Sequence, residues 1–272
     1  MENEIAVIIP TYNSEKTIKR AIDSVKNQVL PKDYSLRIIV VDDCSEDNTR
    51  NIIKKLDVDW YMNYESTGGP NEGRNKGIEL AKDSKYIAFL DHDDEWVNGK
   101  LLSQVQALDA TGNKIVFTAY RITNGDKTIS FEYGQDNVVK YGKNVLFKIF
   151  LSRAYARHVL PYMSSLLIRN EDIPLFDDPV YDYGWSLRLL KDQEVVYIDR
   201  IYMIRYESSS NLSTDENYVS GNIRHIDHTL RKYKAYREAR FCKKNFNFNY
   251  YIKYLMENNK KEAYKALWRT FV

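Results

Sequence analysis

The stretch that decides the fold reads Y-I-A-F-L-D-H-D-D-E-W and spans residues 86–96. Its first half is an apolar run with the length and the β-branched or aromatic character of a strand buried on both faces. Its second half places three carboxylates, Asp91, Asp93 and Asp94, within four positions. Carboxylates this close repel one another, so one of them takes up a proton unless a cation lies between them. An acidic turn or a helix cap is the ordinary alternative, but open α/β sheets place their ligands at the ends of such strands.

Around this stretch, the first hundred residues alternate between strand-like and helix-like segments. Uninterrupted apolar runs predict strands at 5–9, 36–41, 58–64 and 86–90. The segments between them predict helices at 14–29, with Ser14 as the cap, at 46–56 and at 71–82. This order implies βαβ units with right-handed crossovers, and hence an α/β fold with a mostly parallel central sheet and helices on both faces.

The strand-to-helix loops of such a sheet open on one edge, so three loops far apart in sequence are expected to meet there. They are 10–13, 42–45 and 91–94. Tyr12 could stack on a nucleobase, while Asp42 and Asp43 could accept hydrogen bonds from a base or a ribose. In the third crossover, Gly69 allows a phosphate to approach closely and Arg74 can pair with it. Each of these residues alone could equally be core packing or an ordinary turn.

The acidic residues at the end of the fourth strand predict a cation site. Asp91 and Asp93 offer hard oxygen ligands for Mn²⁺ or Mg²⁺, and Mg²⁺ typically binds through one or two carboxylates plus substrate phosphates. The chain contains neither G-x-x-x-x-G-K-[ST] nor G-x-G-x-x-G. A diphosphate therefore needs another mode of binding, which a cation at these carboxylates would supply.

Beyond residue 101 the pattern loosens. It predicts strands at 114–122 and 127–132 around an Asn124-Gly125 turn, at 163–169 and at 195–204, and helices at 143–152 and 184–191. Two helices rich in Tyr and basic residues follow at 217–244 and 250–268, after a Ser- and Asn-rich stretch at 208–215 that suits a mobile loop. We expect one domain over 1–212 and a helical extension over 213–272.

Charge is distributed unevenly, although the formal net charge is only +2. From Arg224 to the end, thirteen Lys and Arg stand against four Asp and Glu, whereas the preceding residues carry 27 bases and 34 acids. Such a basic segment favours an anionic partner such as a membrane surface, although solvated helix faces often look alike. The extension could also pack on the core or form a homo-oligomer interface.

Cysteine content and hydropathy indicate a cytoplasmic protein. Cys44 and Cys242 are the only cysteines, which suits a reducing compartment and argues against a disulfide framework. The start of the chain lacks the pattern of a signal peptide, and no segment reaches the eighteen or so apolar residues that cross a bilayer. Contact with the inner face of a membrane would then be peripheral.

Four segments taken in order carry a family resemblance. They read V-I-I-P-T-Y-N at 7–13, I-I-V-V-D-D-C-S-E-D at 38–47, G-R-N-K-G-I at 73–78, and the quoted stretch at 86–96. This ordered set resembles the signatures of the family 2 glycosyltransferases, which are inverting enzymes of the Rossmann-like GT-A fold. The resemblance implies a nucleotide-diphosphate sugar donor, commonly UDP-linked, and a divalent cation, Mn²⁺ or Mg²⁺, held at the D-x-D.

The positions that match the family motifs imply roles for individual residues. The resemblance implies that Asp43 meets the uracil imide, and that Pro10 and Tyr12 line the base pocket. Asp91 would lie against the ribose and the metal, and Asp93 would be the principal metal ligand. Further contacts to the nucleotide sugar are expected from the same loops, at Asn13, Asp42, Gly69, Arg74 and His92. No partner at ligand spacing supports a zinc site at His92, His225 or His228, which we otherwise expect to be surface or packing residues.

An inverting transfer also needs a general base that takes the proton of the acceptor hydroxyl. Family members place it in a Glu-Asp pair before a helix of the type x-x-L-x-L-R-L, and the matching stretch is V-Y-D-Y-G-W-S-L-R-L at 180–189. The resemblance implies Asp182 as the base, with Tyr181 where the Glu usually stands. Asp177 and Asp178 are local alternatives, and a helix N-cap is the ordinary role of an Asp at position 182.

A second departure from the family pattern is R-Y-E-S at 205–208, where many relatives carry R-x-H. Glu207 occupies the His position. Either Glu207 ligates the cation as an oxygen donor, or the third protein ligand is missing.

We therefore expect a metal-dependent inverting glycosyltransferase that acts by direct displacement, with a donor half at 1–100 and an acceptor half at 101–212. The acceptor would be a hydroxyl of a glycan, a lipid-linked glycan or a protein, and nucleic acid is not an expected partner. A sugar-phosphate nucleotidyltransferase is one alternative, although it should carry a Gly-rich basic loop where this chain has P-T-Y-N at 10–13. A non-catalytic sugar-nucleotide-binding or assembly module is the other.

Overall fold

The structure is a computed structural model that describes residues 3–63, 65–145 and 161–207, together with 221, 224, 225 and 228–232. Its strands are β1 (Glu4–Thr11), β2 (Ser35–Asp42), β3 (Asp59–Met62), β4 (Tyr86–Phe89), β5 (Glu95–Trp96), β6 (Ile115–Thr123), β7 (Thr128–Phe131), β8 (Val138–Tyr141), β9 (Leu166–Arg169) and β10 (Val195–Tyr206). Its helices are α1 (Ile18–Lys26), α2 (Thr49–Ile53), α3 (Pro70–Leu80), α4 (Lys100–Thr111), the short 3-10 helix η1 (Met163–Ser165) and α6 (Tyr183–Leu190).

All of these strands belong to one ten-stranded sheet with the order β3-β2-β1-β4-β9-β6-β10-β5, while β7 pairs with β6 and β8 with β10. The strands β3, β2, β1 and β4 are parallel, as the alternation in the first hundred residues predicts. Beyond β4 the sheet is mixed, because β9 is antiparallel to both β4 and β6. The α/β fold class is thus confirmed. Most of the parallel strand pairs lie in the first half of the chain.

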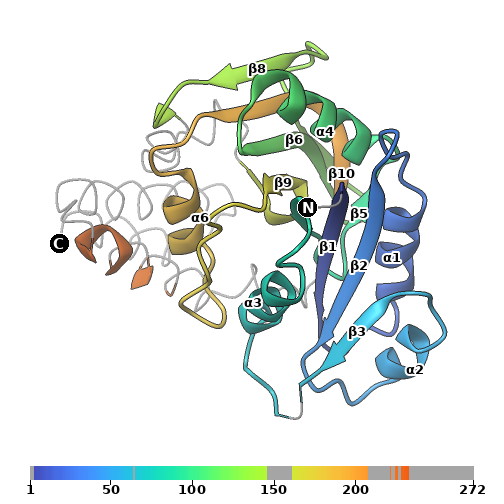
Figure 1. Ribbon diagram of the computed structural model, residues 1–272. Coiled ribbons are helices and arrows are strands. Elements are labelled where there is room, and N and C mark those ends of the chain that lie inside the picture. Colours follow the sequence, from blue (N-terminus) through green and yellow to red (C-terminus); the bar gives the residue numbers. More distant parts are fainter. Residues whose placement is uncertain are drawn as a thin grey trace.

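The order of the strands fixes which helices cover which face (Figure 1). The chain moves in one direction from β1 to β2 to β3, so right-handed crossovers place α1 and α2 on the same face. The connection from β3 to β4 runs back past β2 and β1, which places α3 on the opposite face. Phe176 joins α6 to this second layer, since its ring stacks on Trp185 and lies 5.6 Å from the Arg74 guanidinium.

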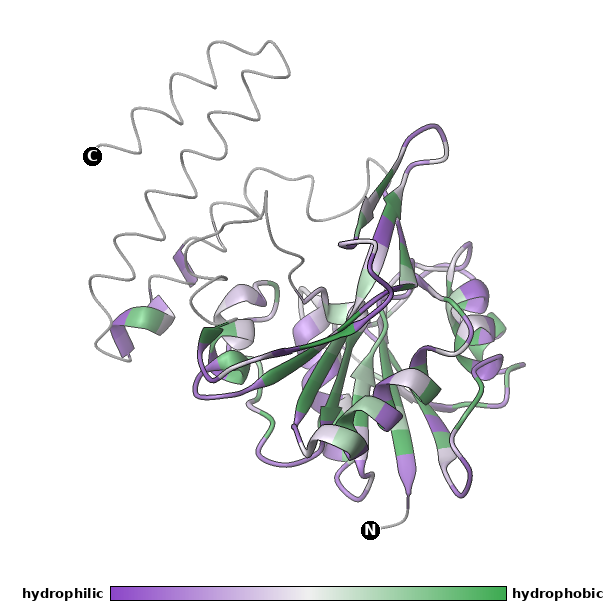
Figure 2. Ribbon diagram, turned by 90° about the horizontal axis from the view of Figure 1, so that it is seen from above, coloured by the Kyte–Doolittle hydropathy of each residue, from purple (hydrophilic) through white to green (hydrophobic). Residues whose placement is uncertain are grey.

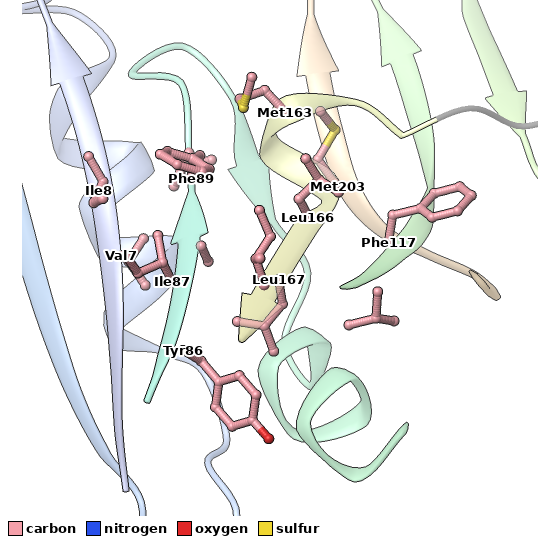
Figure 3. Close-up of a cluster of buried hydrophobic side chains, with 14 of the residues drawn as sticks. Val7, Ile8, Tyr86, Ile87, Phe89, Phe117, Met163, Leu166, Leu167 and Met203 are labelled. Carbon is pink, nitrogen blue, oxygen red and sulfur yellow. The ribbon is translucent and has the colours of Figure 1, made fainter. Parts of the chain in front are cut away.

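The core lies between these layers and along the central strands, where hydrophobic residues concentrate in Figure 2. β4 is buried at every position, as expected for an apolar strand covered on both faces. Figure 3 shows side chains of β1 and β4, such as Val7 and Ile87, together with Leu167 of β9 and Phe117 of β6. The two halves of the chain therefore share one continuous core.

Several predicted elements differ in extent from the observed ones. The helices predicted at 14–29 and 46–56 are shorter, since α1 spans Ile18–Lys26 and α2 spans Thr49–Ile53. The hairpin at Asn124-Gly125 is confirmed by the β6–β7 pairing, but β5 and β8 are short strands that no periodicity signalled. Most of the predicted helix at 143–152, the loop at 208–215 and the helix at 250–268 lie outside the described residues. Of the helices in the described part, none is long and apolar enough to span a bilayer.

Candidate active site

The three loops that follow β1, β2 and β4 meet at one edge of the sheet, as predicted. The backbone N–H of Asn13 donates to Ser45 Oγ at 2.9 Å, and Asn13 Oδ1 accepts from the N–H of Glu46 at 2.8 Å. His92 Nδ1 lies 3.3 Å from Thr17 Oγ1, which ties the acidic loop to the first crossover. Sequence positions separated by some eighty residues thereby become neighbours.

Pro10 and Asp42 have structural roles, which corrects their expected contact with the nucleotide sugar. Pro10 is buried under α3, where a Cβ built at Gly73 would lie 3.2 Å from the Pro10 Cβ. Asp42 is fully buried, accepts a hydrogen bond from Ser45 Oγ, and pairs with Arg50 Nε at 2.8 Å. Neither side chain is accessible to a ligand at this edge, because packing and ion pairing enclose both.

Asp43 organises the loop that leads into α3. Its Oδ1 accepts from Asn63 Nδ2 and from Thr67 Oγ1, each at 2.9 Å, and its Oδ2 lies 3.2 Å from Ser66 Oγ. These bonds leave the side chain almost fully buried. The expected bond from Asp43 to a uracil imide stays a prediction, and it would have to share the carboxylate with this loop.

Tyr12 and Asn13 form the outer part of the same edge. Tyr12 is 47% exposed, so its ring is accessible for stacking. Asn13 has a left-handed backbone with φ 44°, a conformation that Asn tolerates better than most residues, and its side chain holds the β2–α2 loop. Asn13 therefore shapes the loop that carries Tyr12.

The acidic motif after β4 is a tight turn fastened on three sides. The N–H of Asp94 donates to the Asp91 carbonyl at 3.0 Å. Ser164 Oγ accepts from the Asp91 N–H at 3.1 Å and donates to Asp94 Oδ2 at 2.6 Å. Arg20 donates to the Asp93 carbonyl at 2.6 Å. The motif is therefore both the turn and the cluster of carboxylates that the sequence suggested.

The carboxylates of this turn repel one another and are partly buried. Burial raises the pKa of Asp93 and the neighbouring Asp91 raises it further, while His92 and Arg205 oppose the shift. Burial also raises the pKa of Asp94 well above its ordinary value, with Asp91 and Asp93 adding to the effect. Negative charge held this closely in a partly buried turn is stabilised by a bound cation, so the residues present fit Mg²⁺ or Mn²⁺.

In the described residues, Glu207 contacts a guanidinium at the end of β10. Within the described ranges, no three His, Cys, Asp or Glu side chains come together in a metal-binding group. Glu207 Oε1 instead lies 4.0 Å from Arg205 Nη1, at the exposed end of β10. The expectation that Glu207 joins Asp91 and Asp93 as a ligand stays a prediction, and Glu207 would have to leave this contact to bind the cation. Two carboxylates with substrate phosphates and water are still a usual Mg²⁺ set.

Helix α3 connects the acidic turn to the loop before α6. Arg74, which is 3% exposed, donates to Asp91 Oδ1 at 2.6 Å. Asn71 Nδ2 donates to the Asp178 carbonyl at 2.8 Å, and the Asn75 side chain binds both the N–H and the carbonyl of Phe176. Sequence reasoning missed both Asn residues. Their spacing of i, i+3 and i+4 with Arg74, which puts all three on one helix face, is the signal that could have found them.

Gly69 also belongs to this contact. A Cβ at Gly69 would overlap the Pro179 carbonyl oxygen, and the N–H of Asn71 donates to that same oxygen at 3.0 Å. The close approach that only glycine permits is thus made by the protein backbone. The expected contact between Gly69 and a phosphate stays a prediction.

Asp182 lies at the N-cap of α6, partly buried, and its side chain makes no capping hydrogen bond. Burial raises the pKa of this carboxyl, while the Arg74 guanidinium lowers it and the Asp91 carboxylate raises it further. Asp182 therefore lies within electrostatic range of the pair that Arg74 forms with Asp91. Helix α3 and the loops that it holds thereby link residues 43, 91 and 182.

The two alternative bases are already committed elsewhere. Asp177 pairs with Arg188 at 2.6 Å and with His225 at 2.9 Å, and against a partial desolvation these two contacts lower its pKa. Asp178 Oδ1 accepts from the N–H groups of Val180 and Tyr181, at 2.9 and 2.8 Å. A carboxylate with a raised pKa is the better proton acceptor near neutral pH, which favours Asp182.

The chain is similar in sequence to known proteins over most of its length. The profile of Glycosyl transferase family 2 matches residues 6–163. The GalNAc(5)-diNAcBac-PP-undecaprenol beta-1,3-glucosyltransferase of Campylobacter jejuni is 27% identical over 98% of this chain and 88% of its own length. The poly(ribitol-phosphate) beta-N-acetylglucosaminyltransferase TarS of Staphylococcus aureus is 32% identical over 71% of this chain, and the match spans 35% of that protein.

Solved structures show the same fold. Residues 1–349 of S. aureus TarS superpose with a TM-score of 0.62 at 16% identity, covering 97% of this chain and 90% of that one. The same fragment in complex with UDP-GlcNAc gives a TM-score of 0.61 at 17% identity. The family profile includes β1, β2, α3 and the acidic turn, and the named relatives are glycosyltransferases, not nucleotidyltransferases or binding modules. The chain is a glycosyltransferase, and it belongs to Glycosyl transferase family 2.

Proposed function

We propose that the protein transfers a hexose-type sugar from a UDP-linked donor to a hydroxyl group of a lipid-linked or polymeric glycan, with inversion at the anomeric carbon. The observation that carries the proposal is that Asp182, a carboxyl with a raised pKa, interacts electrostatically with both members of the ion pair of Arg74 and Asp91. Relatives whose names specify undecaprenol-linked and poly(ribitol-phosphate) acceptors support the acceptor class. The fold shared with a structure that contains UDP-GlcNAc supports the donor class.

The donor would lie along the edge formed by the loops after β1, β2 and β4. Tyr12 offers an exposed ring for the base, and the diphosphate would lie against the acidic turn. Asp93, with Asp91 beside it, would hold Mn²⁺ or Mg²⁺, because burial and mutual repulsion of these carboxylates favour a bound cation. When bound, such an ion neutralises negative charge on the diphosphate leaving group.

The chemical step follows from the placement of the base. Asp182 accepts the proton of the acceptor hydroxyl as its oxygen forms a bond to the anomeric carbon. The bond between that carbon and the diphosphate oxygen breaks with its electron pair, and UDP leaves on the opposite face. No covalent enzyme intermediate is required, because a single displacement inverts the configuration.

The test separates the base from the cation site. Asp182→Asn should keep UDP binding in the presence of Mn²⁺ but reduce turnover by about 10²–10⁴-fold, the usual contribution of a general base. Asp93→Ala should lose the Mn²⁺-dependent part of UDP binding. The measurements are UDP release over a panel of UDP- and GDP-sugars with lipid-linked and polymeric acceptors, and calorimetric binding of UDP with and without Mn²⁺.

Asp126→Asn, in the exposed β6–β7 turn, is the matched control and should behave as wild type in both assays. Near-full turnover of Asp182→Asn would refute the base assignment. Retained anomeric configuration in the product, read by NMR, would refute direct displacement.

A further inference from the structure

The N-terminus of helix α6 is capped in an unusual way. The side chain of its N-cap residue does not make the capping hydrogen bond. An Asp at an N-cap ordinarily accepts a hydrogen bond from the backbone N–H two or three positions later. Asp182 occupies the N-cap and makes no such bond. The N–H of Gly184, two positions later, instead donates to Nδ1 of His225 at 3.3 Å. An imidazole from a distant part of the chain therefore takes the place of the carboxylate.

His225 is held in the tautomer that this role needs. Because its Nδ1 accepts from Gly184, its Nε2 carries the proton and donates to Asp177 Oδ1 at 2.9 Å. Arg188 of α6 fixes the other oxygen of Asp177 at 2.6 Å. The imidazole is 7% exposed, so it is enclosed between the loop before α6 and the helix itself. One of its nitrogen atoms thus binds the first turn of α6, and the other holds the loop before it.

Small residues allow the segment that carries His225 to approach so closely. The described residues of this segment, 221, 224, 225 and 228–232, are all helical. Gly221, His225 and Thr229 are buried at a spacing of four, which defines one face of a helix. A Cβ at Gly184 would lie 2.5 Å from Thr229 Oγ1 and 2.6 Å from His225 Cε1, so a larger residue does not fit there.

We propose that His225 is a positioning residue for the general base: it caps α6 and holds Asp177, so that the Asp182 carboxylate stays beside Arg74 and Asp91 instead of turning back onto its own helix. The inference rests on the proposed role of Asp182. Without His225, the N–H of Gly184 lacks its acceptor, and the nearest residue suited to replace it is the N-cap carboxylate. A carboxylate engaged as a cap is turned away from the acceptor hydroxyl.

The kinetic test uses three substitutions of His225 in the full chain. His225→Asn keeps an acceptor near the place of Nδ1, His225→Gln keeps a donor near the place of Nε2, and His225→Phe keeps only the ring volume. We expect kcat to fall about 10- to 100-fold in His225→Phe, a part of the full effect of a general base, with the KM for the donor unchanged. His225→Asn should recover most of the loss and His225→Gln little of it. His228→Phe, at an exposed position of the same segment, should be neutral.

A second measurement does not depend on activity. Asp182→Ala should leave the melting temperature unchanged or raise it in the wild-type background, where Asp182 is not the cap. In the His225→Phe background the same substitution should lower the melting temperature, because Asp182 is then the cap. Equal effects in the two backgrounds would overturn the inference, as would unchanged kcat in His225→Phe. Full turnover of Asp182→Asn would instead overturn the proposed base, so the two failures are distinguishable.

Discussion

At the scale of single residues, the site depends on one guanidinium shared by two carboxylates. Arg74 is buried and bound to Asp91, and its positive charge also lowers the pKa of Asp182 against the effect of burial. A buried ion pair of this kind adds little net stability, but removal of one partner is costly because a charge is left unpaired. Arg74 is therefore expected to tune the proton acceptor and to orient Asp91 together.

The pH dependence of turnover tests whether Arg74 lowers the pKa of Asp182. As the proposed base, Asp182 would act only when ionised, so we expect kcat to fall as the pH falls through its pKa. Arg74→Gln removes the charge that lowers this pKa, and we expect the acidic limb of the pH–kcat profile to move to higher pH. Arg74→Lys keeps the positive charge but loses the planar guanidinium. The acidic limb of its pH–kcat profile should stay near that of wild type.

Profiles of kcat against pH at saturating donor would check the prediction, with the folded state verified at each pH by circular dichroism. A limb that moves to lower pH in Arg74→Gln would contradict it, because the sign of the charge effect would then be reversed.

At the scale of elements, α3 is the helix on which the site is assembled. Glycine is normally unfavourable within a helix, yet α3 contains Gly73 and Gly77. Both face β1: a Cβ at Gly77 would overlap the side chain of Ile8, and one at Gly73 would press on Pro10. The absence of side chains lets α3 lie close against the sheet. That position puts Arg74 within reach of the acidic turn and Asn75 within reach of Phe176.

A substitution that usually stabilises a helix should therefore destabilise this one. We expect Gly77→Ala to lower the free energy of unfolding by about 1–3 kcal/mol, the usual cost of overpacking a core, although Ala is the better helix former. Urea denaturation monitored by fluorescence would measure the change. Gly142→Ala is the control, since a Cβ there would have only ordinary contact, 3.9 Å from Val145. A Gly77→Ala variant as stable as wild type would show that α3 is not packed so closely on β1.

At the scale of the whole molecule, the site exists because two halves of the chain share one sheet. The carboxylates that would bind the cation come from the parallel half, but Ser164, which fastens their turn, comes from the segment just before β9. Because β9 is hydrogen-bonded between β4 and β6, neither half completes the site alone. Charge is divided in the same way, with the basic excess after residue 223 and the acidic excess before it.

This division predicts contact with anionic membranes. We expect the full chain to float with vesicles that contain anionic lipid and not with neutral vesicles, since each Lys or Arg near such a surface contributes about 1 kcal/mol. Binding should disappear in 1 M salt, where the Debye length is about 3 Å. We expect flotation to weaken when Gln replaces four lysines of the basic segment, namely Lys253, Lys260, Lys261 and Lys265.

The matched control replaces the same number of exposed lysines in the acidic part of the chain, at Lys16, Lys55, Lys82 and Lys127. Equal loss in both variants would point to net charge alone, and flotation with neutral vesicles would contradict the electrostatic explanation.

The sequence by itself determined the local part of this protein. Apolar runs and the spacing between them predicted β1, β2, β4 and α3, because strand and helix periodicities depend on neighbours along the chain. The edge at which Tyr12, Asp43 and Asp91 meet followed from the handedness of βαβ units, which any such order of elements obeys. The family motifs then indicated the donor class and the residue that would act as base.

Tertiary structure alone decided which of these residues are accessible and which support the others. The packing of Gly69 against Pro179 and the tether of Ser164 to the acidic turn depend on segments distant in sequence, and Asp42 is enclosed by its pair with Arg50. The same holds for His225, whose contact with α6 no local pattern could have shown. Periodicity reports whether a residue faces the core, but its partner there is fixed by how non-local segments pack, and that packing gives each side chain its role.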